Sequence, residues 1–440
     1  MNALVGIISD NSESVVTQML LSWKTNKAAV MISEDTPYEA IKNIVSETGV
    51  KKIYCNENVL QKYHESMPDI DFFPFDETRL WDIRKNIDNY LFPESEETAL
   101  VLYSSGTTGK AKGIMLSHKA INQNAQAVID YMKPDKTDSF FIVKNLIHSS
   151  TIVCEILVAI KNGNNLFFAN EHKNFRKILE QISCSMATIV CINPTILRIL
   201  LKYPNDVLLD KLRNVNKLYV SGAILDAEAV NEARNRLNCI KIINVYGMTE
   251  CGPRIASQEN SSSLVGNSVG KAISQVKIRI IGEDGENIQD SFRVGIVEVN
   301  TPYRAQGYVN GQPLPIDKDG WISTNDLGYF DEEENLYICG RADNMLNVSG
   351  HNVFPETIEG VVKRLECIED CLVEGENNKM TGTKLVCFYK GNNVDKQAVF
   401  EFCRRHLLPH EIPLKFVEVN RIVYVNGKVK RKQFKETRVD

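Results

Sequence analysis

The sequence predicts an α/β fold in which helices cover both faces of a largely parallel sheet. The first 55 residues alternate between short apolar runs and helical patterns. Similar short apolar runs return at 186–193, 217–221 and 241–246. After Gly266 the pattern changes to short β-rich runs punctuated by turn residues, which is typical of a small antiparallel sheet or barrel.

The first unit carries the clearest local signals. We expect Thr36 to cap a helix and Pro37 to take its first position, because Thr36 and Glu39 can satisfy free backbone N–H groups reciprocally. A βαβαβ order implies a parallel sheet covered by helices on both faces. The expected strand, helix, strand, helix and strand lie at residues 4–8, 13–23, 28–32, 37–47 and 52–55.

At least two domains are expected, because 440 residues are too many for one compact core. Three β-rich runs at 276–281, 295–300 and 335–339 predict a subdomain over about 266–340. From about Asp343 the chain is expected to form a helix, strands, a helix and a strand, ending in a basic stretch. We therefore predict a large domain at 1–340 and a small C-terminal domain at 341–440.

Composition excludes several classes of protein. With 43% hydrophobic and 24% charged residues the chain is an ordinary globular sequence. A net charge of -5 argues against nucleic acid as the main partner. No apolar run approaches the ~20 residues of a membrane helix. The start also lacks the features of a secretion signal, so a cytoplasmic location is expected.

The 11 cysteines form no CxxC pair and no cluster at zinc spacing. Cys367 and Cys371 lie four residues apart, in a segment for which a helix is one interpretation. Buried thiols are favoured there over a metal site. Reduced thiols fit a cytosol.

The most informative segment lies at 103–113 and reads YSSGTTGKAKG, directly after an apolar strand at 98–102. Its glycines permit close approach of the backbone to a ligand, and its hydroxyls, N–H groups and lysines can hold phosphate oxygens. It is not a Walker loop, because Ala111 rather than Ser or Thr follows Lys110. By composition alone, a plain surface loop remains the alternative.

Three further segments carry polar residues. Residues 244–250 read NVYGMTE, an apolar strand that ends in Gly and polar groups, where ligands of parallel sheets bind. Asp326 suits a ribose diol, and Arg341 suits the same sugar or a phosphate. Near the end, residues 426–431 read NGKVKR. Taken singly, these are more often a turn, an ion pair and a solvated basic loop.

Together, in this order, the segments resemble the adenylate-forming superfamily of acyl-CoA synthetases, carrier-loading adenylation domains and beetle luciferases. The resemblance covers nearly the whole chain. It implies a large domain of doubly wound mixed sheets with a β-rich subdomain, and a small mobile α+β C-terminal domain. It also implies an ATP-dependent acid–thiol ligase, which forms an acyl-adenylate with Mg²⁺ and passes the acyl group to coenzyme A or a carrier-protein phosphopantetheine.

The resemblance implies a role for each matching position. The phosphate contacts would come from Ser104, Ser105, Gly106, Thr107, Thr108, Gly109, Lys110 and Lys112. The adenine site would be lined by Gly222, Ala223, Asn244, Val245 and Tyr246, with Gly247 and Met248 beside them. Thr249 would contact the α-phosphate, Glu250 would hold Mg²⁺, and Asp326 and Arg341 would bind ribose. Lys428 would be the catalytic lysine and Asp343 the hinge.

The acid substrate and the thiol acceptor stay open. His148 fits a gate between acyl pocket and thiol tunnel, with a buried core histidine as the alternative. His148 and Asn193 would suit an aromatic or hydroxylated acid, and no carboxylate near His148 is available to hold an α-ammonium group. Asn352 stands where some relatives have an Arg for the thiol substrate, and Ile422 where the lysine motif usually has Pro.

Rival interpretations are a non-catalytic nucleotide- or partner-binding relative, and a luciferase-like oxidative enzyme. The first would be expected to lose Glu250 or Lys428, and both are present. A generic phosphotransferase is disfavoured by the missing Walker and kinase signatures.

Overall fold

The structure is a computed structural model of the chain. It describes residues 3–10, 12–75, 90, 92–104, 112–169, 174–261, 266–348, 351–378, 382–422, 424–425, 428–429 and 431. None of the helices in these ranges is both long and apolar enough to cross a bilayer.

The first sheet confirms the predicted strand–helix alternation. In the described residues its strand order is β16-β6-β5-β2-β1-β3-β4, and β1 pairs in parallel with both β2 and β3. The antiparallel pairs β5–β6 and β6–β16 make the sheet mixed. Its strands are β1 (Ala3–Ser9), β2 (Lys27–Ser33), β3 (Lys52–Cys55), β4 (Asp71–Pro74), β5 (Thr98–Ser104), β6 (Lys112–Ser117) and β16 (Gly307–Tyr308). Its connecting helices are α1 (Glu13–Lys24), α2 (Tyr38–Thr48) and α3 (Glu57–Tyr63).

The second sheet has the order β13-β12-β11-β10-β9-β7-β8 in the described residues. Its strands are β7 (Ser139–Ile142), β8 (Asn165–Phe168), β9 (Ile189–Ile192), β10 (Lys217–Val220), β11 (Lys241–Tyr246), β12 (Ala256–Ser257) and β13 (Lys271–Ala272). The helical segments are α5 (His118–Met132), α6 (Ser149–Thr151), η2 (Ile152–Leu157), α7 (Val158–Asn162), α8 (Phe175–Ser185), α9 (Pro194–Leu201), α10 (Asn205–Lys211), α11 (Ala227–Arg236), η3 (Thr249–Cys251) and η4 (Gln258–Asn260).

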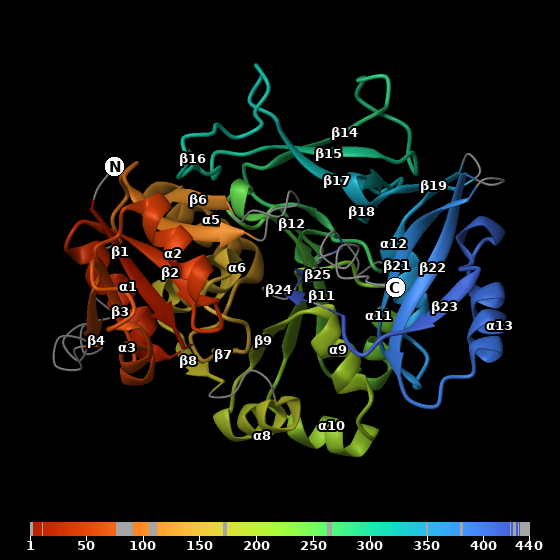
Figure 1. Cartoon of the computed structure of the whole chain (residues 1–440), viewed down its shortest axis with the longest axis horizontal. Coiled ribbons are helices and arrows are strands. Elements are labelled where there is room, and N and C mark those ends of the chain that lie inside the picture. Colours follow the sequence, from red (N-terminus) through yellow and green to blue (C-terminus); the bar gives the residue numbers. More distant parts are fainter. Residues whose placement is uncertain are drawn as a thin grey trace.

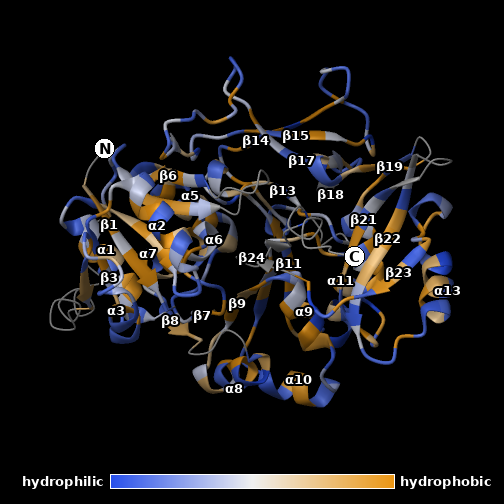
Figure 2. Cartoon of the chain, viewed as in Figure 1, coloured by the Kyte–Doolittle hydropathy of each residue, from blue (hydrophilic) through white to orange (hydrophobic). Residues whose placement is uncertain are grey.

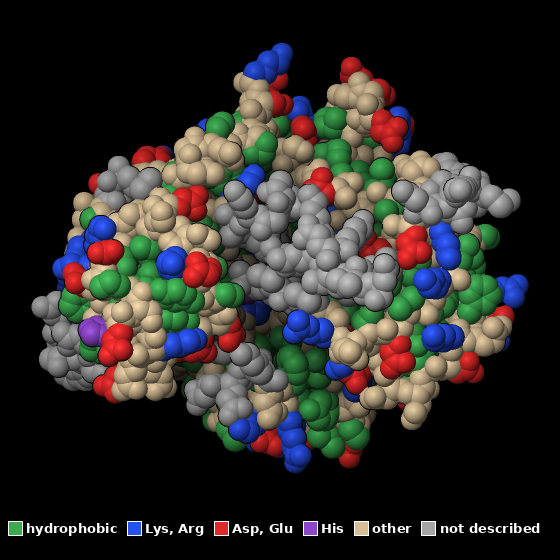
Figure 3. Space-filling view, viewed as in Figure 1, with side chains coloured by type: hydrophobic (Ala, Val, Ile, Leu, Met, Phe, Trp, Pro, Cys, Tyr) green, Lys and Arg blue, Asp and Glu red, His purple; other side chains and the backbone are tan. Residues whose placement is uncertain are grey.

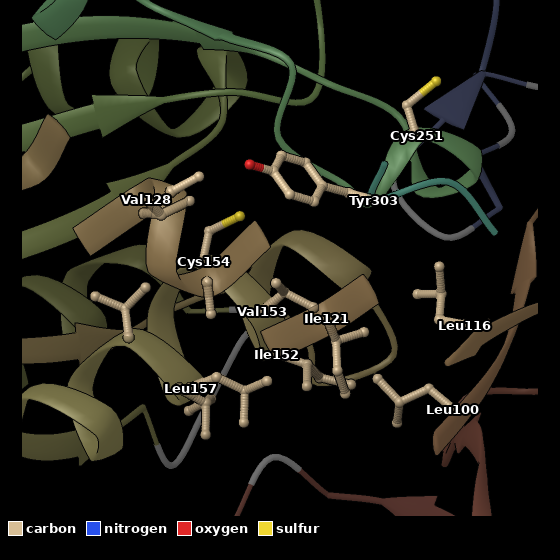
Figure 4. Close-up of a cluster of buried hydrophobic side chains, with 14 of the residues drawn as sticks. Leu100, Leu116, Ile121, Val128, Ile152, Val153, Cys154, Leu157, Cys251 and Tyr303 are labelled. Atoms are coloured by element: carbon tan, nitrogen blue, oxygen red, sulfur yellow. The ribbon is translucent and has the colours of Figure 1, made fainter. Parts of the chain in front are cut away.

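The apolar cores explain why both sheets are covered on both faces. One cluster joins the facing sides of the two sheets through α1, α5 and η2. Figure 4 shows part of it, with Leu100 and Leu116 of the first sheet facing Ile121 and Ile152. Separate clusters cover the outer faces, with α2 and α3 on the first sheet and α8, α9 and α11 on the second. The strands are accordingly apolar along most of their length, as Figure 2 shows for β1 and β9.

A smaller antiparallel sheet follows, as the β-rich runs predicted. Its order is β14-β15-β17-β18, and in Figure 1 it lies above the two larger sheets. Its strands are β14 (Lys277–Ile281), β15 (Gly295–Asn300), β17 (Ile322–Phe330) and β18 (Leu336–Arg341), followed by the 3₁₀ turn η5 (Ala342–Asn344).

The remaining residues build a separate α+β unit with its own apolar cores. It lies on the right in Figure 1, around the sheet β21-β22-β23. Its elements are β19 (Leu346–Val348), β20 (His351–Val353), α12 (Pro355–Val362), β21 (Ile368–Asn378), β22 (Gly382–Gly391), α13 (Lys396–His406), η6 (Pro409–Glu411), β23 (Lys415–Glu418), β24 (Tyr424–Val425) and β25 (Lys428–Val429).

Two local interpretations were wrong, and one element was not predicted. Pro37 is the residue before the first turn of α2, its ψ of 147° is extended, and no side chain caps this helix. The segment containing Cys367 and Cys371 is not a helix, since α12 ends at Val362 and Cys371 lies buried in strand β21. The β19–β20 hairpin, which precedes α12, was not predicted. All eleven cysteines are free.

Candidate functional site

The candidate site lies where the strands of the second sheet end. Because β9, β10 and β11 run in parallel, their carboxyl ends meet at one edge. Asn193, Gly222 and Gly247 directly or closely follow these ends. Ligands of open α/β sheets bind outside this edge.

Ser149 and Thr249 join two of the loops at this edge. Their hydroxyl oxygens lie 2.8 Å apart, within a hydrogen bond. Thr249 begins the η3 turn after β11, whereas Ser149 begins α6. The contact fixes the orientation of the Thr249 hydroxyl, the predicted contact of the α-phosphate.

Glu250, the predicted metal ligand, lies beside Tyr308 of β16. The Tyr308 hydroxyl is 3.5 Å from Glu250 Oε1, at the limit of a hydrogen bond. Burial and the Glu250 carboxylate together raise the pKa of Tyr308 to about 12, so it stays a neutral donor. On the other side, Lys112 Nζ lies 5.0 Å from the centre of the Tyr308 ring. Tyr308 therefore places the end of the predicted phosphate loop next to Glu250.

Asp326 lies between two donors. Tyr246 donates a 2.5 Å hydrogen bond to Oδ2, and Arg341 Nη1 donates a 3.0 Å bond to Oδ1. Asp326 and Arg341 are opposite residues of the β17–β18 ladder, so local pairing brings them together. Tyr246 comes from the second sheet, and burial followed by the Asp326 charge raises its pKa. The three predicted nucleotide ligands thus form one group across two sheets.

Two predicted adenine-site residues also have packing roles. Asn244 donates from its side-chain amide to the carbonyls of Asn267 and Ser268 and is buried. A Cβ on Gly247 would lie 1.8 Å from the carbonyl oxygen of Pro253, so only glycine fits there. Val245 is buried and Met248 half-buried, while Gly222 (φ 95°) and Ala223 are exposed.

The residues predicted for the acyl side lie at the same edge. His148 precedes α6 and is half-buried. Asn193 caps α9, because its Oδ1 accepts a 2.8 Å hydrogen bond from Ile196 N. The side-chain oxygen of Asn193 is therefore engaged by the backbone, and its amide nitrogen is the other polar atom of the side chain.

A buried ion pair supports the same edge. Lys144, after β7, lies 2.9 Å from Glu155 Oε1 and donates a 3.3 Å bond to Ser221 Oγ, after β10. Burial alone would lower the pKa of Lys144, but the Glu155 carboxylate outweighs it and the pKa is raised. Lys144 therefore links two of the loops.

Several predicted residues lie outside the described part of the chain. These are Ser105, Gly106, Thr107, Thr108, Gly109 and Lys110, and the side chains of Ser104 and Lys428. The backbone of Lys428 is described and pairs with Val425 in the β24–β25 hairpin. Asp343, the predicted hinge, is an exposed residue of η5, between β18 and β19.

Sequence reasoning missed Ser149, Tyr308 and Lys144. Each is a common residue type without a local motif, so no sequence signal distinguishes it. Their roles arise from partners that lie 100, 58 and 77 residues away for Ser149–Thr249, Tyr308–Glu250 and Lys144–Ser221.

Comparisons with known proteins show the family of the chain. A family model described as AMP-binding enzyme matches residues 2–309. A long-chain-fatty-acid–CoA ligase of Yersinia pestis is 26% identical over 80% of this chain and 64% of the relative. Tyrocidine synthase 1 of Brevibacillus parabrevis is 24% identical over 99% of this chain and 40% of the relative. The chain thus spans less than two thirds of either relative.

The fold also matches a solved structure. O-succinylbenzoate coenzyme A synthetase from Bacillus subtilis, in complex with ATP and magnesium ion, has a TM-score of 0.83 and 21% identity. The match covers 98% of this chain and 89% of that chain. It confirms the predicted α/β architecture with mixed sheets. Since the family model matches well over half of the residues, the chain belongs to the AMP-binding enzyme family.

Proposed function

We propose that the chain is an AMP-forming acid–thiol ligase, which activates a carboxylic acid with ATP and transfers the acyl group to a thiol. The observation that carries the proposal is the Asp326 carboxylate held between Tyr246 and Arg341. Thr249 and Glu250 follow Tyr246 by only a few residues at the same strand end. A diol-binding carboxylate and phosphate-binding groups are thereby within reach of one nucleotide.

In this proposal each part of the nucleotide is bound by different predicted residues. Asp326 and Arg341 bind the ribose, Gly222, Ala223 and Tyr246 line the adenine, and Thr249 contacts the α-phosphate. The loop at 104–112 closes over the β- and γ-phosphates. Attack by the acid's carboxylate adds negative charge at the α-phosphate, and the Lys428 ammonium offsets it as pyrophosphate leaves.

Glu250 fits the role of a Mg²⁺ ligand. It offers a half-buried carboxylate, whose oxygens are of the hard kind that Mg²⁺ prefers. The bound ion would offset charge on the departing pyrophosphate.

We further propose that the part from 341 to 440 is a mobile domain that turns at Asp343 between the two half-reactions. Support comes from the exposed η5 turn, which lies between β18 and the separate α+β unit. This rotation of the domain would remove Lys428 from the site and bring the segment around Asn352 to the acyl-adenylate. Asn352 is exposed on β20, available to a thiol substrate.

The proposed substrate is a small acyl or aryl acid without an α-amino group, and the acceptor is coenzyme A or a carrier-protein phosphopantetheine. Two relatives support these acceptors, namely a long-chain-fatty-acid–CoA ligase for coenzyme A and tyrocidine synthase 1 for a carrier protein. We place the activity in the cytoplasm, where eleven free thiols would stay reduced.

Over the face shown in Figure 3, Lys and Arg side chains of the described residues are interspersed with Asp and Glu.

The test is a panel of acids in a pyrophosphate-release assay, with and without coenzyme A. With at least one acid, pyrophosphate should be released from ATP. Addition of a thiol should then yield the thioester of that acid. Lys428→Ala should abolish release but still transfer acyl groups from a supplied adenylate. No release with any acid, despite ATP binding, would identify a non-catalytic relative. Oxygen consumption after adenylation would identify an oxidative enzyme.

A further inference from the structure

Arg431 lies three residues after Lys428 and is surrounded by carboxylates. Its Nη2 donates a 2.8 Å hydrogen bond to Glu359 Oε1, and its Nη1 donates a 2.8 Å bond to the carbonyl of Val373. Glu356 and Glu374 lie 3.5 Å and 3.8 Å from the same guanidinium. The Arg431 side chain is only 15% exposed. We call Glu356, Glu359 and Glu374 the carboxylate socket.

The positive charge of Arg431 offsets the buried negative charge of the carboxylate socket. Burial raises the pKa of Glu359, and the Arg431 charge is the largest influence that opposes it. Burial in turn would lower the pKa of Arg431, but the three carboxylates outweigh it and the pKa is raised. Removing one partner of a buried pair leaves an uncompensated charge, which is strongly destabilising. The side chain of Arg431 is therefore held in one place.

The hairpin that carries Lys428 has little support of its own. Strands β24 and β25 have two residues each, and in the described residues they form a separate two-stranded sheet. So short a hairpin is not stable by itself in water. Before the hairpin, Ile422 packs into the cluster of Leu372, Val386 and Phe388. After it comes Arg431, so the hairpin is attached to the domain at both ends.

The socket also borders the proposed hinge. Glu356 Oε1 accepts a 2.6 Å hydrogen bond from Asn344, the residue after Asp343. Glu356 Oε2 lies 3.3 Å from the position that a Cβ on Gly340 would take. All three socket residues follow Asp343 in the chain, so the socket and the hairpin would move together when the domain turns.

We propose that Arg431 is the positioning residue for Lys428. The contacts of Arg431 with the carboxylate socket fix the end of the hairpin, and the fixed hairpin orients Lys428 toward the α-phosphate. This inference rests on the proposed ligase function. Arg431 itself contacts no reacting atom. Its loss should therefore act through the placement of Lys428 and affect the adenylation step alone.

The test compares the two half-reactions in Arg431→Ala. Adenylation should fall in kcat by about tenfold or more with the KM for ATP changed by less than about threefold, because charge stabilisation rather than binding is lost. Thioester formation from a supplied acyl-adenylate should stay near that of the unaltered chain. Arg431→Lys should be intermediate, because one ammonium cannot bond both Glu359 and Val373 in the guanidinium geometry.

Arg279→Ala is the matched control. Arg279 also binds two carboxylates, Glu298 at 2.6 Å and Asp317 at 2.8 Å, but in the β-rich subdomain. Its loss should lower the melting temperature without separating the half-reactions. If Arg431→Ala slows both half-reactions equally, or adenylates normally, the inference is overturned. Should that variant fail to fold, Glu374→Gln gives a milder version of the same comparison.

Hydrogen exchange supplies a readout that needs no activity. In Arg431→Ala the described amides of 424–429 should exchange faster, while those of β1 and β2 in the large domain keep their protection. Unchanged exchange in the hairpin overturns the inference even if the chain proves to be a ligase. If the unaltered chain activates no acid, the ligase proposal fails, and this measurement alone decides whether Arg431 fixes the hairpin.

Discussion

The hydroxyl of Tyr246 donates a 2.5 Å hydrogen bond to Oδ2 of Asp326, across 80 residues of sequence. The bond joins the end of β11 to β17 of the β-rich subdomain. Arg341 binds the other oxygen of the same carboxylate. The carboxylate is thereby held in one orientation before any nucleotide arrives, which lowers the cost of ordering it on binding.

Tyr246→Phe should therefore weaken ATP binding without unfolding the protein. A hydrogen bond to a charged group contributes about 1.5–3 kcal/mol, so the KM for ATP should rise roughly tenfold or more. Asp326→Ala should have a larger effect, because the proposed ribose contact is lost as well. Initial rates of pyrophosphate release at varied ATP give both values. Tyr90→Phe removes a 2.8 Å hydrogen bond to Leu20 away from the site and should leave this KM unchanged.

Glu250→Gln should raise the Mg²⁺ concentration needed for half-maximal rate. The amide oxygen keeps the shape of the side chain but loses the charge that a Mg²⁺ ligand supplies. A titration of rate against Mg²⁺, at fixed ATP, measures the change. A melting temperature lowered by many degrees with normal Mg²⁺ dependence would instead assign the Glu250 side chain a structural role, through its contact with Tyr308.

Arg364→Ala should change the rate of adenylation relative to that of thioester formation. Arg364 follows α12, and its guanidinium binds Glu228 of α11 and lies 3.9 Å from Asp226. The pair joins the α+β unit to the large domain, so a turn at Asp343 would break it. Partly exposed pairs contribute at most about 1 kcal/mol, which predicts a change of up to about fivefold in the ratio of half-reaction rates.

The control for this pair is the variant in which the two charges are exchanged. Arg364→Glu combined with Glu228→Arg should restore only part of the ratio, because the attraction between positions 364 and 228 is rebuilt while Asp226 repels the introduced carboxylate. Single-turnover rates of each half-reaction in the single and double variants form the required cycle. A double variant as impaired as Arg364→Glu alone would contradict the role assigned to the pair.

His118→Phe should flatten the pH dependence of stability. His118 is buried against Trp23, with ring centroids 5.3 Å apart, and burial lowers its pKa from 6.5 to about 4. The unfolded chain therefore binds this proton at a higher pH than the folded chain. Stability is lost as pH falls from 6.5 to about 4, by up to ~3 kcal/mol from this group.

Urea unfolding at several pH values between 7 and 4 measures that difference. The unaltered chain should lose more stability on acidification than the variant. Replacement of the exposed His64 by Gln is the control and should leave the profile unchanged. Parallel profiles for the unaltered chain and His118→Phe would show that His118 takes up its proton equally in both states.

The alternation of strands and helices was predictable because it depends on short-range patterns. The strand at 52–55 and that at 241–246 were predicted with the bounds of β3 and β11, since apolar runs of strand length are local signals. Glu250 and Thr249 could be singled out for the same reason, as polar residues at a strand end. The prediction that Thr36 caps the helix was wrong, because several neighbouring residues can begin a helix and local sequence signals do not distinguish between them.

The sequence by itself thus determined the alternation of strands and helices in the first unit and the segments that carry polar residues suited to a nucleotide. Only the tertiary structure decided their partners: Tyr246 for Asp326, Ser149 for Thr249, Tyr308 for Glu250, and the carboxylate socket for Arg431. Such pairs are separated by tens of residues and depend on how sheets and helices stack. Local propensity and periodicity extend over a few residues only, so they contain no information about contacts that form when distant elements pack together.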